Sequence, residues 1–483
     1  MRGRVWVSYL MVAMAMAAGS PAAAAAEPAV STAQAEAGEG PPAVEVAVTR
    51  DGGVWTADYV FAKDAPVWGF IRSSLINGSR EAWRPGDWSV VTPGVVLERV
   101  GNLDVLRAID GGDVPRRVSL RLTPRDHNLE ADYGVLIFTD GSTAMFTGAF
   151  DVFPLASLEA ARAAPEDLNG FVMDKSNARI TWRDASGPVL LHGQRQDRAV
   201  TEDGTTYVLF GAAQMKEGER LVTVVDPELP AWVAATIEDF GPRVAEYYTG
   251  RMGPGQSDRP TVVASWKGPT PGLQSMGGSV LPGLIVMNFE GIGQVRPSPD
   301  SEASTRWFIG HESAHFWLGQ TVRYERSRDS WITEGGADLM AIRALKTLYP
   351  DYDARTELQR EVDDCVRLAV KPVREAVSRG EYRAFYACGA VFALTAEGVQ
   401  RRATGGDWFD FLRPLIDANR EDGVLTREEW LTELTRVSGD ASLRADIEIL
   451  LDDGAADPAA LIAALFDRTG VGYRREDGKI RLD

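Results

Sequence analysis

The sequence predicts a multidomain α+β protein, in which a β-rich N-terminal domain precedes a small mixed sheet and a lobe of helices. From about residue 43 to 228, short runs of alternating apolar and polar residues are separated by turn residues, which is typical of strands. From Pro230 onward, apolar residues recur at helical spacing. Two strand-like runs, 261–266 and 283–288, interrupt this helical pattern. With 483 residues, 45% of them hydrophobic, the chain has enough apolar material for more than one domain core.

Residues 1–26 are typical of a cleaved secretory signal peptide. Arg2 and Arg4 precede an apolar run over 5–18, and small residues then lead to a cleavage point before Glu27. A transmembrane anchor is the alternative interpretation, but this run is shorter than the ~18 apolar residues of a membrane span. We therefore expect a periplasmic or secreted protein with no stable membrane insertion after signal cleavage.

The N-terminal domain is expected over 43–228, after a flexible linker over 27–42 that is rich in Ala, Pro, Glu and Gly. Residues 44–48 alternate as a half-buried strand does. Turn residues separate 135–138 from 143–150, which predicts a hairpin. Helices are expected to be few in this domain.

The catalytic lobe is expected over 229–402, with a helical C-terminal part over 403–483. Its first helix is predicted from Pro230 to about Gly250, because apolar and aromatic residues there recur every three or four positions. Further helices are predicted over about 301–319, 331–348, 355–379, 384–402, 407–419, 426–437, 441–452 and 458–468.

The net charge of −18 and the pI of about 4.9 exclude one class of partner. Nucleic-acid binding needs clustered Lys and Arg to neutralise phosphates, and this acidic chain lacks that balance. The same charge disfavours an anionic membrane surface. No pattern in the sequence indicates an oligomeric state.

A metal-binding motif stands in the predicted helix 301–319. His311-Glu312-Ser313-Ala314-His315 is an H-E-x-x-H run with apolar residues on both sides. Because residues four apart share a helix face, both imidazoles can reach one ion. Glu312 then lies beside the open position of the ion, where it can take a proton from water. The alternative is a helix with two hydrogen-bonded core histidines.

Glu334 is the predicted third ligand, since catalytic zinc uses three protein ligands and leaves one position open. It follows His315 after eighteen intervening residues and opens the next predicted helix. The alternative is an ordinary first-turn Glu, which the helix dipole favours. Asp338, one turn later, is predicted to accept the distal N–H of a ligating His, or else to be a solvated helix Asp. The prediction is one Zn²⁺ per chain.

These motifs resemble the gluzincin metallopeptidases, and most of all the M1 aminopeptidase family with its thermolysin-like catalytic domain. The metal motif is followed by Glu334 in a Trp-Ile-x-Glu-Gly-x-Ala setting. The segment that begins Gly277-Gly278-Ser279 is similar to the family's G-A-M-E-N run, and Tyr386-Ala-Cys-Gly-Ala is similar to Y-E-K-G-A. The resemblance covers about residues 229–400 and is weak in the N-terminal domain.

The resemblance implies roles for individual residues. Zn²⁺ would be held by His311, His315 and Glu334, with Glu312 as general base. Tyr386 would donate to the oxyanion of the transition state, although it could instead be a packed aromatic. The substrate backbone would contact Gly277, Gly278 and Ser279.

Two positions depart from the family pattern. Val280 occupies the place of the Glu that grips the free amino group of the substrate, and valine cannot pair with an ammonium. An acid such as Glu290, or one from the β domain, could replace it; otherwise the protein cuts internally or accepts substrates without a free N-terminus. Cys388 replaces the Lys of Y-E-K-G-A. With Cys365 it completes the only two cysteines, which we expect to form a disulfide after export; the alternative is two buried thiols.

The sequence thus favours an exported zinc metallopeptidase that acts on peptide or protein substrates. The alternative is a non-catalytic or endo-acting peptide-binding protein on the same fold. A hydrolase of another class, such as an epoxide hydrolase, has no positive support. We expect His127 and His192 to be surface or loop residues, and 417–429 not to bind calcium because its glycine is one position out of frame.

Overall fold

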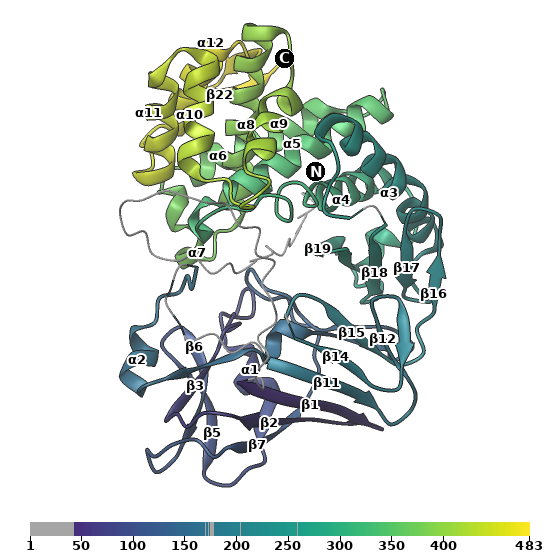
Figure 1. The fold of residues 1–483 in the computed structure, drawn as a ribbon. Coiled ribbons are helices and arrows are strands. Elements are labelled where there is room, and N and C mark those ends of the chain that lie inside the picture. Colours follow the sequence, from purple (N-terminus) through teal and green to yellow (C-terminus); the bar gives the residue numbers. More distant parts are fainter. Residues whose placement is uncertain (1–42, 170, 172, 174–177, 203, 258) are drawn as a thin grey trace, which may run out of the picture. The chain divides into compact units, whose positions relative to one another are not determined.

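The computed structural model describes residues 43–483 except 170, 172, 174–177, 203 and 258, so the predicted signal peptide and linker lie outside the described residues. The described part forms two compact units (Figure 1). The β-rich unit comprises 43–127 and 144–211, and the helical unit comprises 128–143 and 212–483. The boundary that the sequence predicts, after residue 228, differs from this division.

The β-rich unit is built from short strands. They are β1 (Val44–Asp51), β2 (Val54–Phe61), β3 (Val67–Phe70), β4 (Trp88–Val90), β5 (Val95–Val100), β6 (Leu103–Ala108), β7 (Arg117–Leu122), β9 (Thr143–Phe146), β10 (Val152–Leu155), β11 (Ala178–Asp184), β12 (Val189–Leu191), β13 (Gln194–Gln196), β14 (Ala199–Thr201) and β15 (Tyr207–Phe210). The largest sheet has the order β14-β11-β1-β2-β7-β4, and a second has the order β10-β3-β6-β5. The helices of this unit are short: α1 (Trp83–Asp87), α2 (Leu158–Ala163) and the 3₁₀ turn η1 (Thr147–Phe150).

The alternation read from the sequence sets the register of the large sheet. Val44, Val46 and Val48 of β1 are buried, because side chains two apart share one face of a strand. Strand β1 pairs in parallel with β11 and antiparallel with β2. The predicted strand 143–150 is shorter than expected, since its second half is the turn η1.

A five-stranded sheet opens the helical unit. Its order is β16-β17-β18-β20-β19, with bounds Met215–Glu217, Val222–Val225, Thr261–Trp266, Leu284–Glu290 and Ser275–Leu281 for β16, β17, β18, β20 and β19. Strands β17, β18 and β20 are parallel, and β19 runs antiparallel to β20 at the sheet edge. The sequence predicts β18 and β20 but assigns the residues of β19 to a loop. This short strand follows Pro and Gly residues and contains two glycines, which strands usually lack.

Ten helices and a terminal hairpin are present in the described residues of the helical unit (Figure 1). They are α3 (Ala231–Met252), α4 (Pro299–Ala314), α5 (Trp331–Leu348), α6 (Ala354–Leu368), α7 (Ala376–Arg379), α8 (Arg383–Thr404), α9 (Trp408–Ala418), α10 (Arg427–Ser438), α11 (Ala441–Asp452), α12 (Pro458–Thr469), β21 (Tyr473–Glu476) and β22 (Lys479–Leu482). The helix expected over 355–379 is two helices, because Pro372 cannot continue α6. One large hydrophobic cluster joins these elements to the sheet.

Helices α6 and α8 are joined covalently as well as by packing. The sulfurs of Cys365 and Cys388 are bonded, and both residues are completely buried. No helix among the described residues combines the length and the hydropathy that a membrane span requires.

Candidate metal centre

Three side chains from two helices converge on one point in the helical unit. His311 lies in the last turn of α4, His315 caps its C-terminus, and Glu334 stands in the first turn of α5. The Nε2 atoms of the two histidines are 3.0 Å apart, and the Oε2 atom of Glu334 lies 3.5 Å and 3.6 Å from them. All three residues are buried. The fold therefore brings the three predicted ligands together.

Local sequence explains where the two helices begin and end. A capping box of Ser298 and Ser301, with Pro299 at the first helical position, starts α4. The helix ends at Ala314, five residues earlier than predicted, so His315 is not inside it. His315 keeps αR backbone angles (φ −66°, ψ −13°), which preserves its position one turn after His311.

Hydrogen bonds on the far side of each imidazole orient the lone pairs inward. His311 Nδ1 lies 2.7 Å from Oδ1 of Asp338, and His315 Nδ1 lies 2.7 Å from the carbonyl oxygen of Leu318. A carbonyl and a carboxylate only accept, so both Nδ1 atoms carry the proton and donate. When both rings are neutral, as metal binding requires, the two Nε2 atoms present lone pairs to the same point. The sequence predicts the Asp338 contact but not the Leu318 carbonyl.

The arrangement fits a zinc ion. Four tetrahedral bonds of ~2.0–2.1 Å require ligand atoms about 3.3 Å apart, close to the three observed separations. Two imidazole nitrogens and one carboxylate oxygen are a typical catalytic donor set that leaves a position open. Oε2 of Glu334 has no hydrogen-bond partner among the described residues. A divalent cation would satisfy the two facing lone pairs and this oxygen together.

The electrostatics of the site favour a positive charge at the same point. Burial lowers the pKa of His311, but the carboxylate of Asp338 outweighs this effect and raises the pKa to about 10. Burial raises the pKa of Glu334, yet the two imidazoles bring it down to about 2. The pocket of carboxylates around the histidines thus attracts a cation before any substrate is bound.

Glu312 directly follows His311 in α4, and its side chain makes no hydrogen bond among the described residues. It is 1% exposed, and neither of its carboxylate oxygens has a partner among the described residues. Burial raises its pKa to about 7, despite the neighbouring His311. It packs against Gly278 of β19, where a Cβ atom would lie 2.4 Å from its carboxyl carbon. Only glycine leaves room for Glu312 at that position.

Tyr386 reaches the triad from α8. Its ring stacks on that of His311 with centroids 5.9 Å apart, and its hydroxyl is buried without a hydrogen-bond acceptor within bonding distance in the described part. Burial and the charge of Glu334 raise its pKa well above the ordinary value, so the hydroxyl keeps its proton. It is therefore a donor that faces the metal position.

A close crossing of two helices brings Tyr386 to this place. Helix α8 crosses α5 at Gly389 and Gly335, and a Cβ atom on Gly335 would lie 2.1 Å from the carbonyl carbon of Gly389. Glu334 directly precedes one glycine, and Tyr386 precedes the other by one turn. The two glycines thus set the distance between a metal ligand and the tyrosine.

The predicted substrate-binding residues lie on the edge strand β19. Gly277, Gly278 and Ser279 pair with β20, and the hydroxyl of Ser279 is buried without a partner in the described residues. Val280 follows them with its side chain buried in the hydrophobic cluster. Glu290 pairs with Ser275, which lies five residues before Val280 on β19. The carboxylate of Glu290 accepts a hydrogen bond from the hydroxyl of Thr270. It is therefore not placed to replace the missing acid.

The carboxylate behind His311 is expected to control metal affinity. Replacing Asp338 by Asn keeps the size of the side chain but removes the charge that orients His311 and increases its basicity. Zinc affinity should fall about 10–100-fold, measured by competition with a chromophoric chelator. Asp363→Asn, at an exposed position of α6, is the matched control. A change below threefold for Asp338→Asn would show that this contact does not support the metal.

A buried acid in the loop between α4 and α5 is expected to oppose folding at neutral pH. Burial raises the pKa of Asp329 from 3.8 to about 6. Its protonated form is therefore the one that the folded state favours: this stabilisation is complete below pH 3.8 and lost as pH rises through about 6. Asp329→Asn should raise the free energy of unfolding at pH 7.5 by about 1–3 kcal/mol.

Urea unfolding of Asp329→Asn and wild type at pH 7.5 and 4.5 measures this effect. The contributions of all other titrating groups cancel in the difference between their free energies of unfolding. The gain should shrink at pH 4.5. Asp351→Asn, on an exposed residue, should show no such pH dependence. An equal gain at both pH values would assign the effect to packing rather than to charge.

Comparisons with known proteins give a fold but no close relative. No protein-family model matches the chain, and no curated protein matches it. An aminopeptidase N family protein from Idiomarina loihiensis is similar in structure, with a TM-score of 0.60, 11% identity, and coverage of 87% of this chain and 78% of that one.

Two other solved structures are similar at lower scores. One is a variant M1 zinc metallopeptidase from Deinococcus radiodurans bound to a Tyr-Ser-Ala substrate (TM-score 0.46, 12% identity, 86% and 94% coverage). The other is native yeast LTA4 hydrolase (TM-score 0.49, 12% identity, 86% and 68% coverage). With its β-rich N-terminal part followed by a small sheet and a lobe of helices, the chain has the fold of the aminopeptidase N family protein from Idiomarina loihiensis, in a divergent form.

Proposed function

We propose that this protein is an exported zinc-dependent metallopeptidase that hydrolyses peptide bonds with Glu312 as general base. The observation that carries the proposal is a buried triad with tetrahedral spacing beside a carboxylate that has no other partner. A site that only stored or sensed a metal would need neither Glu312 nor Tyr386. Zn²⁺, one per chain, would be held by His311, His315 and Glu334.

The side chains divide the chemistry of hydrolysis between them. Zn²⁺, when bound, supplies Lewis acidity and lowers the pKa of water. Glu312 accepts the proton of the attacking water, and its buried carboxylate has no other hydrogen-bond partner among the described residues. The protonated hydroxyl of Tyr386 donates to the oxyanion that develops on the scissile carbonyl, in a buried position where such a bond is worth most.

The edge strand β19 supports a peptide as substrate. The carbonyl oxygen of Val280 accepts from the side-chain amide of Gln320 at 2.9 Å, so it points away from β20 toward the edge of β19 that pairs with no strand. Backbone groups two residues apart point the same way in a strand, so those of Gly278 also face the edge. An extended peptide could pair with Gly278 directly beside Glu312.

Recognition of the free N-terminus of a peptide requires an acid near Val280. The hydroxyl of Tyr133 donates to the Val280 carbonyl at 3.4 Å, which brings the segment 128–143 to this strand. Glu130 and Asp132 flank Tyr133 and are 9% and 4% exposed. We propose Asp132 or Glu130 as the group that grips the substrate amine. If neither does so, cleavage is internal or needs no free N-terminus.

Product analysis on matched peptides tests the function. Purified holoprotein is incubated with a peptide set whose members carry either a free or an acetylated N-terminus, and products are identified by mass spectrometry. We expect release of N-terminal residues from the free forms, loss of turnover after zinc is removed by a chelator, and recovery when Zn²⁺ is restored. Asp132→Asn and Glu130→Gln should reduce cleavage of the free forms selectively.

Two outcomes would redirect this proposal. Equal cleavage of free and acetylated peptides would establish an endo-acting enzyme. Stoichiometric zinc without cleavage of any peptide would favour the non-catalytic peptide-binding alternative. Export is part of the proposal because of residues 1–26, and N-terminal sequencing of protein recovered from the periplasm or medium, with a new terminus near Glu27, tests it.

A further inference from the structure

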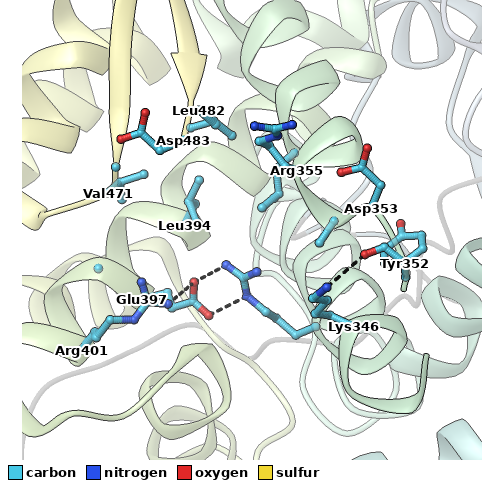
Figure 2. Close-up of a pocket in the computed structure, with 15 residues that line it drawn as sticks. Lys346, Tyr352, Asp353, Arg355, Leu394, Glu397, Arg401, Val471, Leu482 and Asp483 are labelled. Carbon is cyan, nitrogen blue, oxygen red and sulfur yellow. Dashed lines mark hydrogen bonds and ion pairs between the residues drawn. The ribbon is translucent and has the colours of Figure 1, made fainter. Parts of the chain in front are cut away.

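A second pocket, away from the metal centre, lies among α5, α6, α8 and the terminal hairpin (Figure 2). It has a volume of about 380 Å³, which falls within the ~300–1,000 Å³ range of small-molecule sites. Arg343 follows Glu334 by nine positions on α5, and Glu397 follows Tyr386 by eleven positions on α8. At ~1.5 Å per residue, the pocket and the metal centre are about 13–16 Å apart along these helices.

The floor of the pocket is a buried carboxylate held by two arginines. Glu397 is 1% exposed; Arg343 donates to it through Nε at 2.8 Å and through Nη2, and Arg401 approaches it at 3.2 Å. Figure 2 shows Glu397 beside Arg401. One carboxylate thus faces two guanidinium groups, so the floor keeps a surplus of positive charge.

The wall formed by the start of α6 adds a cation that makes no close ion pair among the described residues. Arg355 is exposed and its guanidinium makes no hydrogen bond or ion pair in the described part of the chain, although it lines the pocket. The nearby acid, Asp353, is occupied as the helix cap, accepting from the backbone and hydroxyl of Thr356. Asp483 also lines the pocket, so the lining carries four cationic side chains (Arg343, Lys346, Arg355 and Arg401) and three carboxylate side chains (Asp353, Glu397 and Asp483). This is an excess of one positive charge in a chain whose net charge is −18.

Part of the remaining wall is apolar. Leu358, Leu394 and Leu482 are 5–7% exposed and line the pocket from three different elements. A ligand that buried apolar surface against them would gain ~25 cal/mol per Å² of area removed from water. We propose that the pocket binds a small amphipathic carboxylate, with its charged group on Arg355 and its hydrocarbon part against these leucines.

Calorimetric titration of the holoprotein tests this assignment with two matched probes, 4-phenylbutyrate and its neutral amide. The carboxylate should bind about tenfold more tightly or better, since a charge-assisted hydrogen bond is lost in the amide. Arg355→Gln should reduce the affinity for the carboxylate to that for the amide. Arg367→Gln, at an exposed position on the same helix, should leave both affinities unchanged.

The metal centre can also take a carboxylate, and the variants separate the two sites. Binding of the carboxylate that is unchanged in Arg355→Gln would belong to another site and would overturn the proposal, as would equal binding of both probes. Val471→Trp, which fills the pocket from the loop before β21, provides a second check. It should abolish the binding that depends on Arg355 without changing the zinc content.

Discussion

Glu312→Gln should reduce peptide hydrolysis about a thousandfold while the protein keeps its zinc. The amide matches the carboxylate in size, so the contact with Gly278 is preserved, but it cannot accept a proton from water. General bases contribute ~10²–10⁴-fold to rate, and Glu312 has no hydrogen bond that the substitution would disturb elsewhere. Steady-state kinetics on the best peptide, with metal content from elemental analysis of the same sample, measures both effects.

Glu302→Gln is the matched control for this prediction. It makes the same chemical change on the same helix, at a partly exposed residue paired with Arg306. Its activity should stay within twofold of wild type. A Glu312→Gln protein that retained a tenth of the wild-type activity would assign proton transfer to another group and remove the basis of the proposed mechanism.

Gly335→Ala should have the second largest effect, on both stability and activity. The new methyl group would stand 2.1 Å from the backbone of α8, which cannot move aside as the end of a flexible side chain can. Overpacking of this kind costs about 1–3 kcal/mol or more. Separation of α5 from α8 would also draw Tyr386 away from the metal position, and the loss of one oxyanion donor lowers kcat about 10²–10³-fold.

Gly310→Ala is the control for this crossing. Gly310 directly precedes His311, yet its Cβ atom would meet only Ala341 and Leu345 at 3.4–3.6 Å. Because alanine favours the helix over glycine by about 1 kcal/mol, this variant should be at least as stable as wild type. Urea denaturation and kcat compare the two variants, and equal behaviour would show that the close approach of α5 and α8 is not required.

The metal ligands could be predicted because helical geometry translates spacing into position. Four residues from His311 to His315 make one turn, and a carboxylate at the start of the next helix returns to the same point. The partner of His315 could not be predicted in this way. It is the backbone carbonyl of Leu318. Every residue carries such a group, so no side-chain pattern predicts this contact.

The β-rich character of the N-terminal unit was predicted, but some of its strands were not, because tertiary contacts override local preference. Strands β3 to β6 are not expected from the sequence. Between them lies Arg84, which is 0% exposed and paired with buried Asp104 at 2.7 Å. Its guanidinium stacks on Phe70 and Trp88. A charged residue ordinarily lies at the surface. Arg84 can be buried because the folded sheet places an acid and aromatic rings against it, and the sequence does not show these contacts.

The complete burial of Cys365 and Cys388 has a consequence for the preparation of this protein. Both cysteines are 0% exposed, so oxidants and reductants should react with them only when the surrounding structure opens. The redox state should therefore change slowly in the folded protein. Material from a reducing cytoplasm and material from an oxidising compartment would therefore be two distinct preparations, and thiol counting under denaturing conditions should come before any comparison of their activities.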